Sequence, residues 1–335
     1  MTDITLTLDE VRTLATQVLT ENGCDPANAD AVAAVITAAE RDGCHSHGLM
    51  RLAGYVASLK SGKVNGHAEP KVEQLAPSVV RVNGNGGFAP LALARGRDAL
   101  IEAARTNGIA AMALVDVHHF AALWGEVEPV AEAGLCALAC VSYKPVVIPA
   151  GGSKALYGTN PLAFGWPRRD KPPLIFDQAS SVMARGEVML AAREGHELPA
   201  GVGVDTDGEA TTDPNKVLDG AMLAFGGHKG SSIAMMIELF AGALIGECFS
   251  FEAAERDNND GGPPSGGELM IAMDPSRFGD ADGWADHAEK LFAKIEEQQD
   301  ARLPSARRYQ NRIKTAQEGV RVSEKAYAAV KALSE

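Results

Sequence analysis

Cysteine pairs and a leader-like N-terminus are missing from this chain. Its five cysteines are an odd number, and no two of them form a CxxC pair. This argues against a disulfide framework or a zinc site and favours buried thiols in a reducing compartment. The N-terminal stretch MTDITLTLDE contains neither a basic region nor an apolar core. We therefore expect no signal peptide and a cytoplasmic protein.

Positive charge and long apolar segments are scarce as well. The 31 Lys and Arg residues are outnumbered by 44 Asp and Glu residues, which leaves a formal net charge of -13. Nucleic acids and anionic membranes select basic surfaces, so neither is expected as a partner, although a local basic pocket for an anionic ligand stays open. The longest apolar run, IAMMIELFAGALIG, is too short to cross a membrane and includes Glu238, so it predicts a buried helix.

The hydrophobic pattern predicts an α/β (α+β) fold with two domains. At 335 residues, with 46% hydrophobic and 22% charged residues, the chain can bury more than one core. Helical periodicity covers the N-terminal part and returns near the C-terminus, whereas β-rich runs alternate with helices in between. We expect a helical domain of residues 1–75 and 280–335 and a central α/β domain of residues 76–279. The β-rich runs are SVVRVN, IAAMALVDV, LCALACVS, PLIFDQA and ELMIAMD.

The stretch VNGNGGFAP outlines a dinucleotide-binding fingerprint. Gly84, Gly86 and Ala89 follow a β-run and precede a helix with G-x-G-x-x-A spacing. Pro90 comes directly after the third small residue, and no regular alternation of strands and helices follows, which weakens this Rossmann interpretation. The alternative is a glycine-rich turn that joins the strand to the helix, and the spacing alone leaves both open.

The stretch DNNDGGPPSGGE matches a calcium-binding loop only in part. Asp257, Asn259, Gly262 and Glu268 fit the template, but Gly261 stands where a side-chain ligand is needed. Two prolines stiffen the middle of the stretch, and a strand rather than a helix is expected to follow. We therefore interpret this segment as a flexible surface loop.

The stretch DGCHSHGLMR places a hydroxyl, an imidazole and a guanidinium together. A helix is predicted from near Ser46 to near Gly62, so His47 and Arg51 would share one helix face. A helix N-terminus favours a neutral histidine, and an arginine can hold a carboxylate through two parallel hydrogen bonds. The pair would suit proton transfer beside an anchored 2-oxo or 2-imino acid. The plainer alternative is that Ser46 caps the helix while His47 and Arg51 are solvated.

Three further segments could meet an anion. His118 and His119 follow a β-run, and because adjacent histidines rarely bind one metal, they predict a ligand-binding loop or a polar turn. FGGHKGSS resembles a phosphate-binding turn in which Lys229 supplies charge. ARLPSARRYQNR is a basic island that suits either a phosphate or a solvated connector. Jointly the motifs suggest a phosphate-bearing cofactor and a small carboxylate substrate.

In their order along the chain, these motifs resemble the malate/L-lactate dehydrogenase family that lacks a Rossmann fold. The matching stretches are DGCHSHGLMR, HHFAALW, YGTNPLAFG, FDQASS with ARGE, and FGGHKGS, and they cover essentially the whole chain. Within that family, AAREGHELPAGVGVD and ARLPSARRY are most similar to enzymes that reduce cyclic imino acids. The resemblance implies an unusual α/β domain for a nicotinamide cofactor beside a largely helical domain, usually in a homodimer.

The resemblance also implies roles for individual residues. Ser46 and His47 match the catalytic pair, Arg51 matches the carboxylate-binding arginine, and Thr159 matches a substrate contact. Where the related reductases are expected to have an aspartate completing the Ser-His relay, this chain has Glu187, which keeps the charge and adds a methylene. No metal is implied. The implied cofactor contacts are His118, His119, Phe120, Ala121, Ala122, Asp177, Gln178, Ala179, Arg185, Gly186, Lys229, Arg302, Leu303, Pro304, Ser305, Ala306 and Arg307.

The implied reaction is hydride transfer from NADPH, with NADH as a second option, to C2 of a cyclic imino acid. Δ1-Piperideine-2-carboxylate would give L-pipecolate, and Δ1-pyrroline-2-carboxylate would give L-proline. The nearest alternative is an NAD(P)-dependent dehydrogenase of an open-chain 2-hydroxy acid such as malate, lactate or ureidoglycolate. More distant alternatives are a non-catalytic small-ligand binding protein and a metal hydrolase built on His118 and His119.

Overall fold

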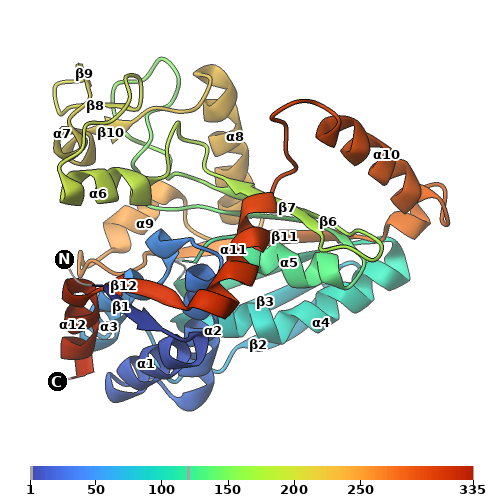
Figure 1. Cartoon of the computed structure of the whole chain (residues 1–335), viewed down its shortest axis with the longest axis horizontal. Helices are drawn as coiled ribbons and strands as arrows, with labels where there is room; N and C mark the ends of the chain where they lie inside the picture. The colour runs from blue at the N-terminus through green and yellow to red at the C-terminus, as the bar shows by residue number, and fades with distance from the viewer. Residues whose placement is uncertain (1–2, 119–120, 335) are drawn as a thin grey trace.

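The computed structural model describes residues 3–118 and 121–334. Within them the largest sheet has seven strands in the order β2-β3-β4-β11-β5-β6-β7 (Figure 1). The β3–β4 pair is parallel, and every other pair in this sheet is antiparallel. The strands are β2 (Lys71–Ala76), β3 (Val79–Phe88), β4 (Ile109–His118), β5 (Cys136–Val141), β6 (Leu162–Trp166), β7 (Leu174–Gln178) and β11 (Ser265–Met273). The fold is therefore α/β as predicted, and its sheet is not the parallel sheet of a doubly wound fold.

Both faces of the sheet are covered, because its central strands are apolar on both sides. In β4, Met112 and Leu114 join the core under α4 (Ala89–Asn107) and α5 (Trp124–Glu132). Ala113 and Val115 between them join the core under α8 (His228–Glu238) and the π-helical turn Leu239–Ala243. Successive side chains of a strand point to opposite faces, so one apolar run supplies two cores.

The glycine-rich stretch VNGNGGF lies inside β3, so its interpretation as a turn is wrong. Gly87 and Phe88 pair with the end of β4 after a register shift that begins at Asn83. A Cβ atom on Gly84 would lie 2.1 Å from Val117 Cγ1, so glycine allows the two strands to approach there. The glycines serve strand packing and form no phosphate-binding turn.

The N-terminal helices pack with the last strand and helix of the described chain into a helical layer. Val11 and Leu19 of α1 (Leu8–Glu21), Ile36 of α2 (Pro26–Arg41) and Leu52 of α3 (Leu52–Lys60) share a core with Val320 of β12 (Val320–Ser323). Strand β1 (Asp3–Leu6) pairs with β12, and α12 (Glu324–Lys331) closes the layer, so the termini lie near each other (Figure 1). The Thr7 and Glu10 capping box expected at the start of α1 is present.

The helix α10 (Trp284–Glu296) packs on the sheet rather than on the helical layer. Its Phe292 shares a small core with Leu174 of β7 and Leu303. The domain division at residues 75/76 and 279/280 stays a prediction. A third group of elements forms a core of its own around Val188, Val217 and Met222. It consists of α6 (Arg185–Glu194), α7 (Pro214–Asp219), β8 (Gly203–Val204), β9 (Ala210–Thr211) and β10 (Ala221–Met222).

The apolar run IAMMIELFAGALIG is only half buried, in contrast to the prediction. Ile237 and Ala241 pack on the sheet, but Met235, Leu239 and Leu244 are 49%, 50% and 64% exposed. None of the described helices is long and apolar enough to cross a membrane. The five cysteines are free thiols, as predicted, although Cys44 is half-buried rather than buried.

The segment after α9 (Ser250–Arg256) is a loop with exposed residues, as predicted, but it is anchored by buried ion pairs. The side chain of Asp257 is 1% exposed, and it accepts hydrogen bonds from Lys63 Nζ at 2.9 Å and from Lys144 Nζ at 2.7 Å. Asp260 also pairs with Lys63, which holds its pKa below the usual range against the opposing effect of burial. These ion pairs join the C-terminal end of α3 to the α/β part of the chain.

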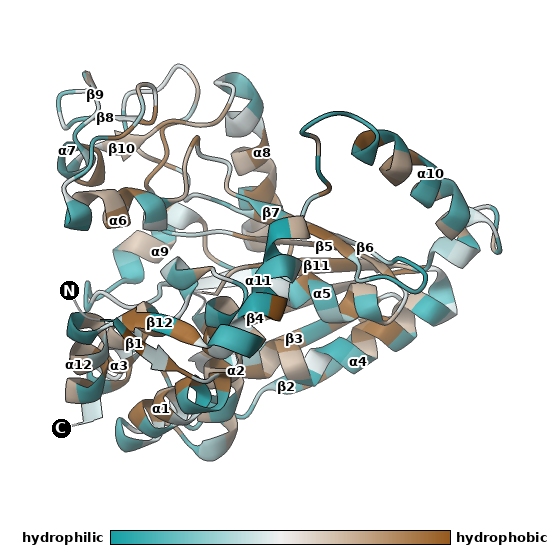
Figure 2. Ribbon diagram, viewed as in Figure 1, coloured by the Kyte–Doolittle hydropathy of each residue, from teal (hydrophilic) through white to brown (hydrophobic). Residues whose placement is uncertain are grey.

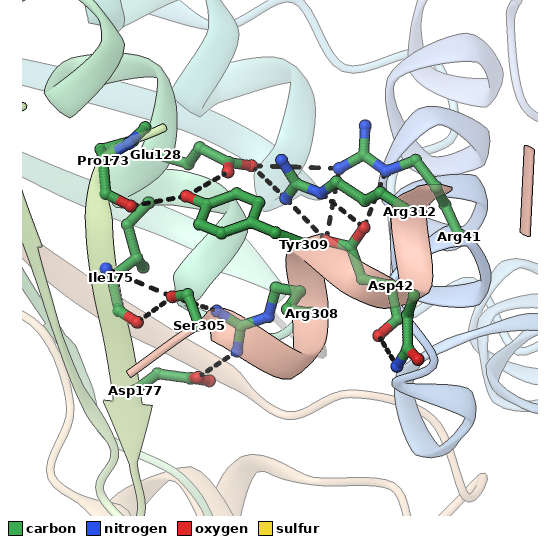
Figure 3. A network of polar contacts seen from close by, with 11 residues as sticks. Arg41, Asp42, Glu128, Pro173, Ile175, Asp177, Ser305, Arg308, Tyr309 and Arg312 are labelled. Carbon is green, nitrogen blue, oxygen red and sulfur yellow. Dashed lines mark hydrogen bonds and ion pairs between the residues drawn. The ribbon is translucent and has the colours of Figure 1, made fainter. Parts of the chain in front are cut away.

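The helix α11 (Ala306–Glu318) lies between the helical layer and the sheet and is held by polar contacts (Figure 3). Arg312 donates two hydrogen bonds of 2.7 Å to the Asp42 carboxylate and one of 2.7 Å to Glu128. Tyr309 Oη donates to the carbonyl oxygen of Pro173 at 2.6 Å. Most of α11 is hydrophilic, as Figure 2 shows, so its position depends on these contacts rather than on apolar burial.

Replacement of Arg312 by Met should destabilise the protein by about 3 kcal/mol, because the buried carboxylates of Asp42 and Glu128 lose one of the two arginines that they share, with only Arg41 left. Urea unfolding followed by circular dichroism measures this loss. The matched control is Lys314→Met on the same helix, whose ion pair with Glu318 is exposed, and which should change stability by less than about 0.5 kcal/mol. Equal stability of the two variants would contradict a structural role for the Arg312 ion pairs.

Candidate active site

A cavity between the helical layer and the sheet gathers most of the predicted site. Its volume is about 210 Å3. We call it the active-site cavity. The predicted residues that line it are His47, Arg51, Ala121, Ala122, Thr159, Asp177, Gln178, Ala179, Arg185 and Gly186.

The turn that carries His47 and Arg51 is built on the buried carboxylate of Glu40. Glu40 accepts hydrogen bonds from Leu49 N at 2.8 Å and from His45 Nδ1 at 2.6 Å, and this contact raises the pKa of His45. A Cβ atom on Gly48 would lie 2.0 Å from Glu40 Oε1. Glycine is therefore required where the chain crosses this carboxylate, and the helix breaks there.

The predicted helix from Ser46 to Gly62 is consequently wrong in its first turns. The structure has two 3-10 turns, His45–His47 and Leu49–Arg51, before α3 begins at Leu52. His47 and Arg51 are brought to the same cavity by this broken path and not by a shared α-helical face. Because no α-helix begins at His47, the structure does not support the expectation that a helix N-terminus favours a neutral His47.

Ser46 orients the imidazole of His47. Ser46 Oγ lies 3.0 Å from His47 Nδ1. If the hydroxyl donates to Nδ1, the remaining proton of the neutral imidazole is on Nε2, which becomes a donor. Ser46 itself packs against α6, because a Cβ atom on Gly186 would lie 3.3 Å from Ser46 Cβ. The pair is therefore held between the helical layer and α6.

Arg51 is a buried cation in the cavity wall. Its side chain packs below Ser46, and its Nε donates to the Ser46 carbonyl oxygen at 2.6 Å. Burial lowers the pKa of Arg51, and the nearby phenols of Tyr55 and Tyr143 partly oppose this effect. A desolvated guanidinium gains more from an anionic ligand than an exposed one does, because the surrounding dielectric is low.

The loop that carries Thr159 is fixed by Asn160. Asn160 is fully buried, with a φ of 36°, and its side chain accepts from Tyr143 N at 3.2 Å and donates to Glu238 Oε1 at 2.7 Å. The Thr159 carbonyl oxygen accepts from Ser180 N at 2.7 Å. Asn160 is therefore a structural residue, and Thr159 beside it lines the cavity.

Arg308 contributes to the site although the sequence analysis did not assign it a role. It donates to Asp177 Oδ1 at 3.1 Å and lies 4.5 Å from the centre of the Trp124 ring. Burial raises the pKa of Asp177, and Arg308 opposes that rise. The basic island had been recognised, but a spacing argument cannot tell which of its arginines turns inward. Arg308 itself is not in the cavity wall. The cavity residues that the sequence did not predict are Leu123, Val141, Ser142, Tyr143, Pro161, Ala184 and Met189.

The remaining predicted residues lie outside the cavity wall. Glu187 is exposed, and among the described residues its carboxylate has no hydrogen bond or ion pair. His118 Nδ1 lies 3.4 Å from the Pro263 carbonyl oxygen, and burial lowers the pKa of this histidine. His119 and Phe120 are outside the described residues.

The C-terminal cofactor residues divide into structural and exposed positions. Leu303 is part of a small core, and Ser305 exchanges hydrogen bonds with the backbone of Ile175 in β7. Ala306 begins α11. Arg302, Pro304, Arg307 and Lys229 are exposed.

Two buried carboxyl groups lie behind the cavity. Glu268 is fully buried in β11, and Glu126 in α5 is 6% exposed. The two side chains are close enough for Glu268 to affect the pKa of Glu126. Burial raises the pKa of Glu126 to about 7, and Glu268 and Arg97 oppose this rise. No cluster of His, Cys, Asp or Glu suited to a metal ion is found in the described part of the chain.

Comparison with known proteins identifies relatives over nearly the full chain. The family model of malate/L-lactate dehydrogenase matches residues 6–331. A Δ1-pyrroline-2-carboxylate/Δ1-piperideine-2-carboxylate reductase from Pseudomonas aeruginosa is 49% identical over 334 residues, which cover 99% of this chain and 100% of the relative. A Δ1-pyrroline-2-carboxylate reductase from Ancylobacter novellus is 49% identical over 333 residues, 98% of this chain and 97% of the relative.

A solved structure is similar in fold. The Δ1-piperideine-2-carboxylate reductase from Pseudomonas syringae pv. tomato superposes with a TM-score of 0.94 and is 42% identical, over 98% of this chain and 99% of that one. The arrangement of the seven-stranded sheet and the helical layer is thus shared with an enzyme of known structure.

The raised pKa of Glu126 predicts how stability changes with pH. In the folded protein this carboxyl has a pKa of about 7, whereas an unfolded glutamate has a pKa of about 4.3. The folded chain therefore binds more protons between these values, and the contribution of Glu126 to the free energy of unfolding falls as the pH rises from 4.3 to 7. Glu126→Gln has no carboxyl to titrate and does not show this loss. The difference in the free energy of unfolding between Glu126→Gln and wild type should therefore rise by up to about 3 kcal/mol as the pH increases across that window.

Urea unfolding at pH 5, 6, 7 and 8 measures the difference. Glu255→Gln, at an exposed position, is the matched control and should follow the wild-type profile. A Glu126→Gln profile that runs parallel to wild type would contradict the raised pKa.

Proposed function

The chain belongs to the malate/L-lactate dehydrogenase family, and we propose that within it the chain is an NADPH-dependent reductase of cyclic imino acids. The substrates would be Δ1-piperideine-2-carboxylate and Δ1-pyrroline-2-carboxylate, which are reduced at C2 to L-pipecolate and L-proline. The observation that carries this proposal is one cavity that holds His47, Arg51 and Thr159 together in a chain similar throughout to reductases of these imines. The enzyme is an NAD(P)H-dependent oxidoreductase.

The cavity wall suits a nicotinamide cofactor. Ala121, Ala122 and Ala179 present small side chains, and any side chain at Gly186 would press on Ser46 and Arg51. These residues leave room for a flat ring beside His47 and Arg51. Arg185, whose pKa is lowered by burial, offers a cation to a phosphate. When bound, NADPH supplies the hydride.

Arg51 and Thr159 would hold the substrate. The Arg51 guanidinium would bind the ring carboxylate. C2, the carbon that carries this carboxylate, would then lie next to Arg51 in the cavity. Thr159 adds a hydrogen bond from its side chain. Fixing the ring in one orientation supplies much of the rate enhancement in a reaction of this type, because the two reacting groups are already held in the geometry that the reaction needs.

His47 would hold the proton for the ring nitrogen. With Ser46 Oγ on Nδ1, Nε2 carries the proton that faces the cavity. A cyclic imine can arrive protonated on nitrogen, so His47 then keeps that proton in place rather than donating it. Glu187 stays our candidate for completing the relay through Ser46, since it is the neighbour of Gly186, which packs on Ser46.

The preference for NADPH over NADH, the homodimer and the cytoplasmic location are further parts of the proposal. Arg302, Arg307 and Lys229 are exposed cations that no ion pair occupies among the described residues, and a 2′-phosphate would need such partners. The exposed apolar side chains Met235, Leu239 and Leu244 support burial against a second copy of the chain. Free thiols support a reducing compartment.

A substrate panel tests the proposed function. Oxidation of NADPH is followed by absorbance with each cyclic imine and, separately, with pyruvate and oxaloacetate. We expect kcat/KM to be at least about 100-fold higher for the imines, because the open-chain ketones need a full proton donor. NADH in place of NADPH should lower kcat/KM by about tenfold or more. Turnover of the open keto acids alone would instead assign the chain to the hydroxy-acid dehydrogenases.

Replacement of His47 by Ala should lower kcat by about 100-fold and leave the Kd of NADPH within about twofold, since the imidazole acts on the substrate proton. Steady-state kinetics and NADPH fluorescence titration measure the two quantities. His67→Ala is the matched control, because His67 is exposed and outside the cavity. An unchanged kcat in the His47 variant would show that this histidine has no role in proton transfer.

A further inference from the structure

A second cavity shares Ala121 and Ala122 with the active-site cavity. It measures about 200 Å3 and is formed by one face of α2, the N-terminal half of α4 and the start of α5. The proposed mechanism does not use it. An engineered cavity of about 150 Å3 holds a benzene molecule, so this one can admit a ring of five or six atoms with a small substituent.

The walls of the second cavity combine an apolar surface with two opposite charges. Val35, Leu93 and Trp124 supply apolar contacts. The charged residues are Arg97 of α4 and Glu126 of α5. A small number of precisely placed polar groups on a mostly apolar wall is typical of a small-molecule site.

Arg97 has no carboxylate partner within 4.0 Å among the described residues. Burial lowers its pKa, and the nearby acids Glu126, Asp98 and Glu132 raise it only partly. Among the described residues Arg97 makes no hydrogen bond and no ion pair within 4.0 Å. The partly buried arginines Arg168, Arg308 and Arg312 all have carboxylate partners. A desolvated guanidinium without a carboxylate is costly, and a bound carboxylate would offset the cost.

Glu126 offers the complementary charge. It faces Glu268 of β11, Arg97 of α4, Asp177 of β7 and Tyr55 of α3. Burial raises the pKa of Glu126, and a bound ammonium group would favour its ionised form. Arg97 and Glu126 both line the cavity and attract each other, and among the described residues Arg97 has no ion pair within 4.0 Å.

We propose that the second cavity binds a small apolar α-amino acid as a zwitterion. Its carboxylate would contact Arg97, its ammonium group would contact Glu126, and its aliphatic part would pack on Val35, Leu93 and Trp124. An α-amino acid carries an ammonium and a carboxylate group on the same carbon, so it can meet two opposite charges in one cavity at once. L-Proline and L-pipecolate have this chemistry, but the inference rests on the cavity and not on the reaction proposed above.

Calorimetric titration of L-proline into the Arg51→Gln variant tests the proposal. This variant removes the carboxylate partner in the active-site cavity, so the binding that remains belongs to the second cavity. We expect L-proline to bind this variant and the affinity to fall at least tenfold when Arg97→Gln is added, since a charge-assisted contact is lost. Arg95→Gln, at an exposed position on the same helix, is the matched control and should leave the affinity unchanged.

Val35→Phe in the Arg51→Gln background is a second test that leaves both charges in place. The larger ring fills the cavity, so L-proline binding should also fall at least tenfold. Thermal unfolding of each variant confirms that it is folded before titration.

Two ligands test the need for both charges. Cyclopentanecarboxylate has the ring and the carboxylate without the nitrogen, and pyrrolidine has the ring and the nitrogen without the carboxylate. Both should bind at least tenfold more weakly than L-proline. Equal affinity for either one would overturn the zwitterion assignment.

No binding of L-proline to Arg51→Gln, or equal binding after Arg97→Gln and Val35→Phe, would overturn the second site altogether. These outcomes are independent of the proposed reaction, which fails only if wild-type enzyme does not reduce the cyclic imines. If L-proline binds to the Arg51→Gln variant but the wild-type enzyme does not reduce the cyclic imines, the second site is supported and the proposed function is wrong.

Discussion

The ion pairs between Arg312 and the buried carboxylates of Asp42 and Glu128 set the geometry on which the candidate active site depends. Asp42 stands at the end of α2, directly before the turn that carries Ser46, His47 and Arg51. The same helix, α11, holds Asp177 at the far wall through Arg308. One amphipathic helix from the C-terminal part of the chain thus fixes both sides of the cavity. Because the contacts are directional hydrogen bonds, they define the spacing of the walls more narrowly than apolar contacts of equal strength would.

Polar contacts recur where the helical layer meets the sheet, and apolar packing dominates within each. On another side of the molecule, Lys63 after α3 pairs with Asp257 and Asp260, and Lys144 next to Tyr143 pairs with Asp257. The Lys63, Asp257 and Asp260 side chains in this cluster are all less than a tenth exposed. Buried charges are costly unless they are paired, so each pair favours one relative position of the two layers. The active-site cavity lies between these two sets of ion pairs.

The sequence predicted the fold class, the capped helices and most of the cavity residues, and it failed where a contact distant in sequence decides local structure. Short apolar runs bounded by polar or glycine residues predict strands whatever their neighbours are, so β4, β5, β7 and β11 were found near their observed bounds. The glycines of β3 suggested a turn, because nothing local reveals that Val117 of the adjacent strand requires them. The helix break at Gly48 depends on the carboxylate of Glu40, and the inward direction of Arg308 depends on Trp124 and Asp177. Such contacts exist only in the folded chain.

Burial of Arg51 also explains why a carboxylate on the substrate would matter for more than affinity. The Arg51 guanidinium donates to the Ser46 carbonyl oxygen, and a neutral acceptor of this kind is a weaker partner than an anion. An incoming carboxylate therefore gains a strong contact in a region of low dielectric, whereas an imine without a carboxylate would displace water from Arg51 and offer nothing in return. Arg51 Nε donates a hydrogen bond to the backbone of Ser46, the residue before His47. A carboxylate bound to Arg51 would therefore also tighten the turn that carries the imidazole. In the proposed function, one short turn would determine both substrate selection and proton placement, and the shape of this turn follows from the buried Glu40 beneath Gly48.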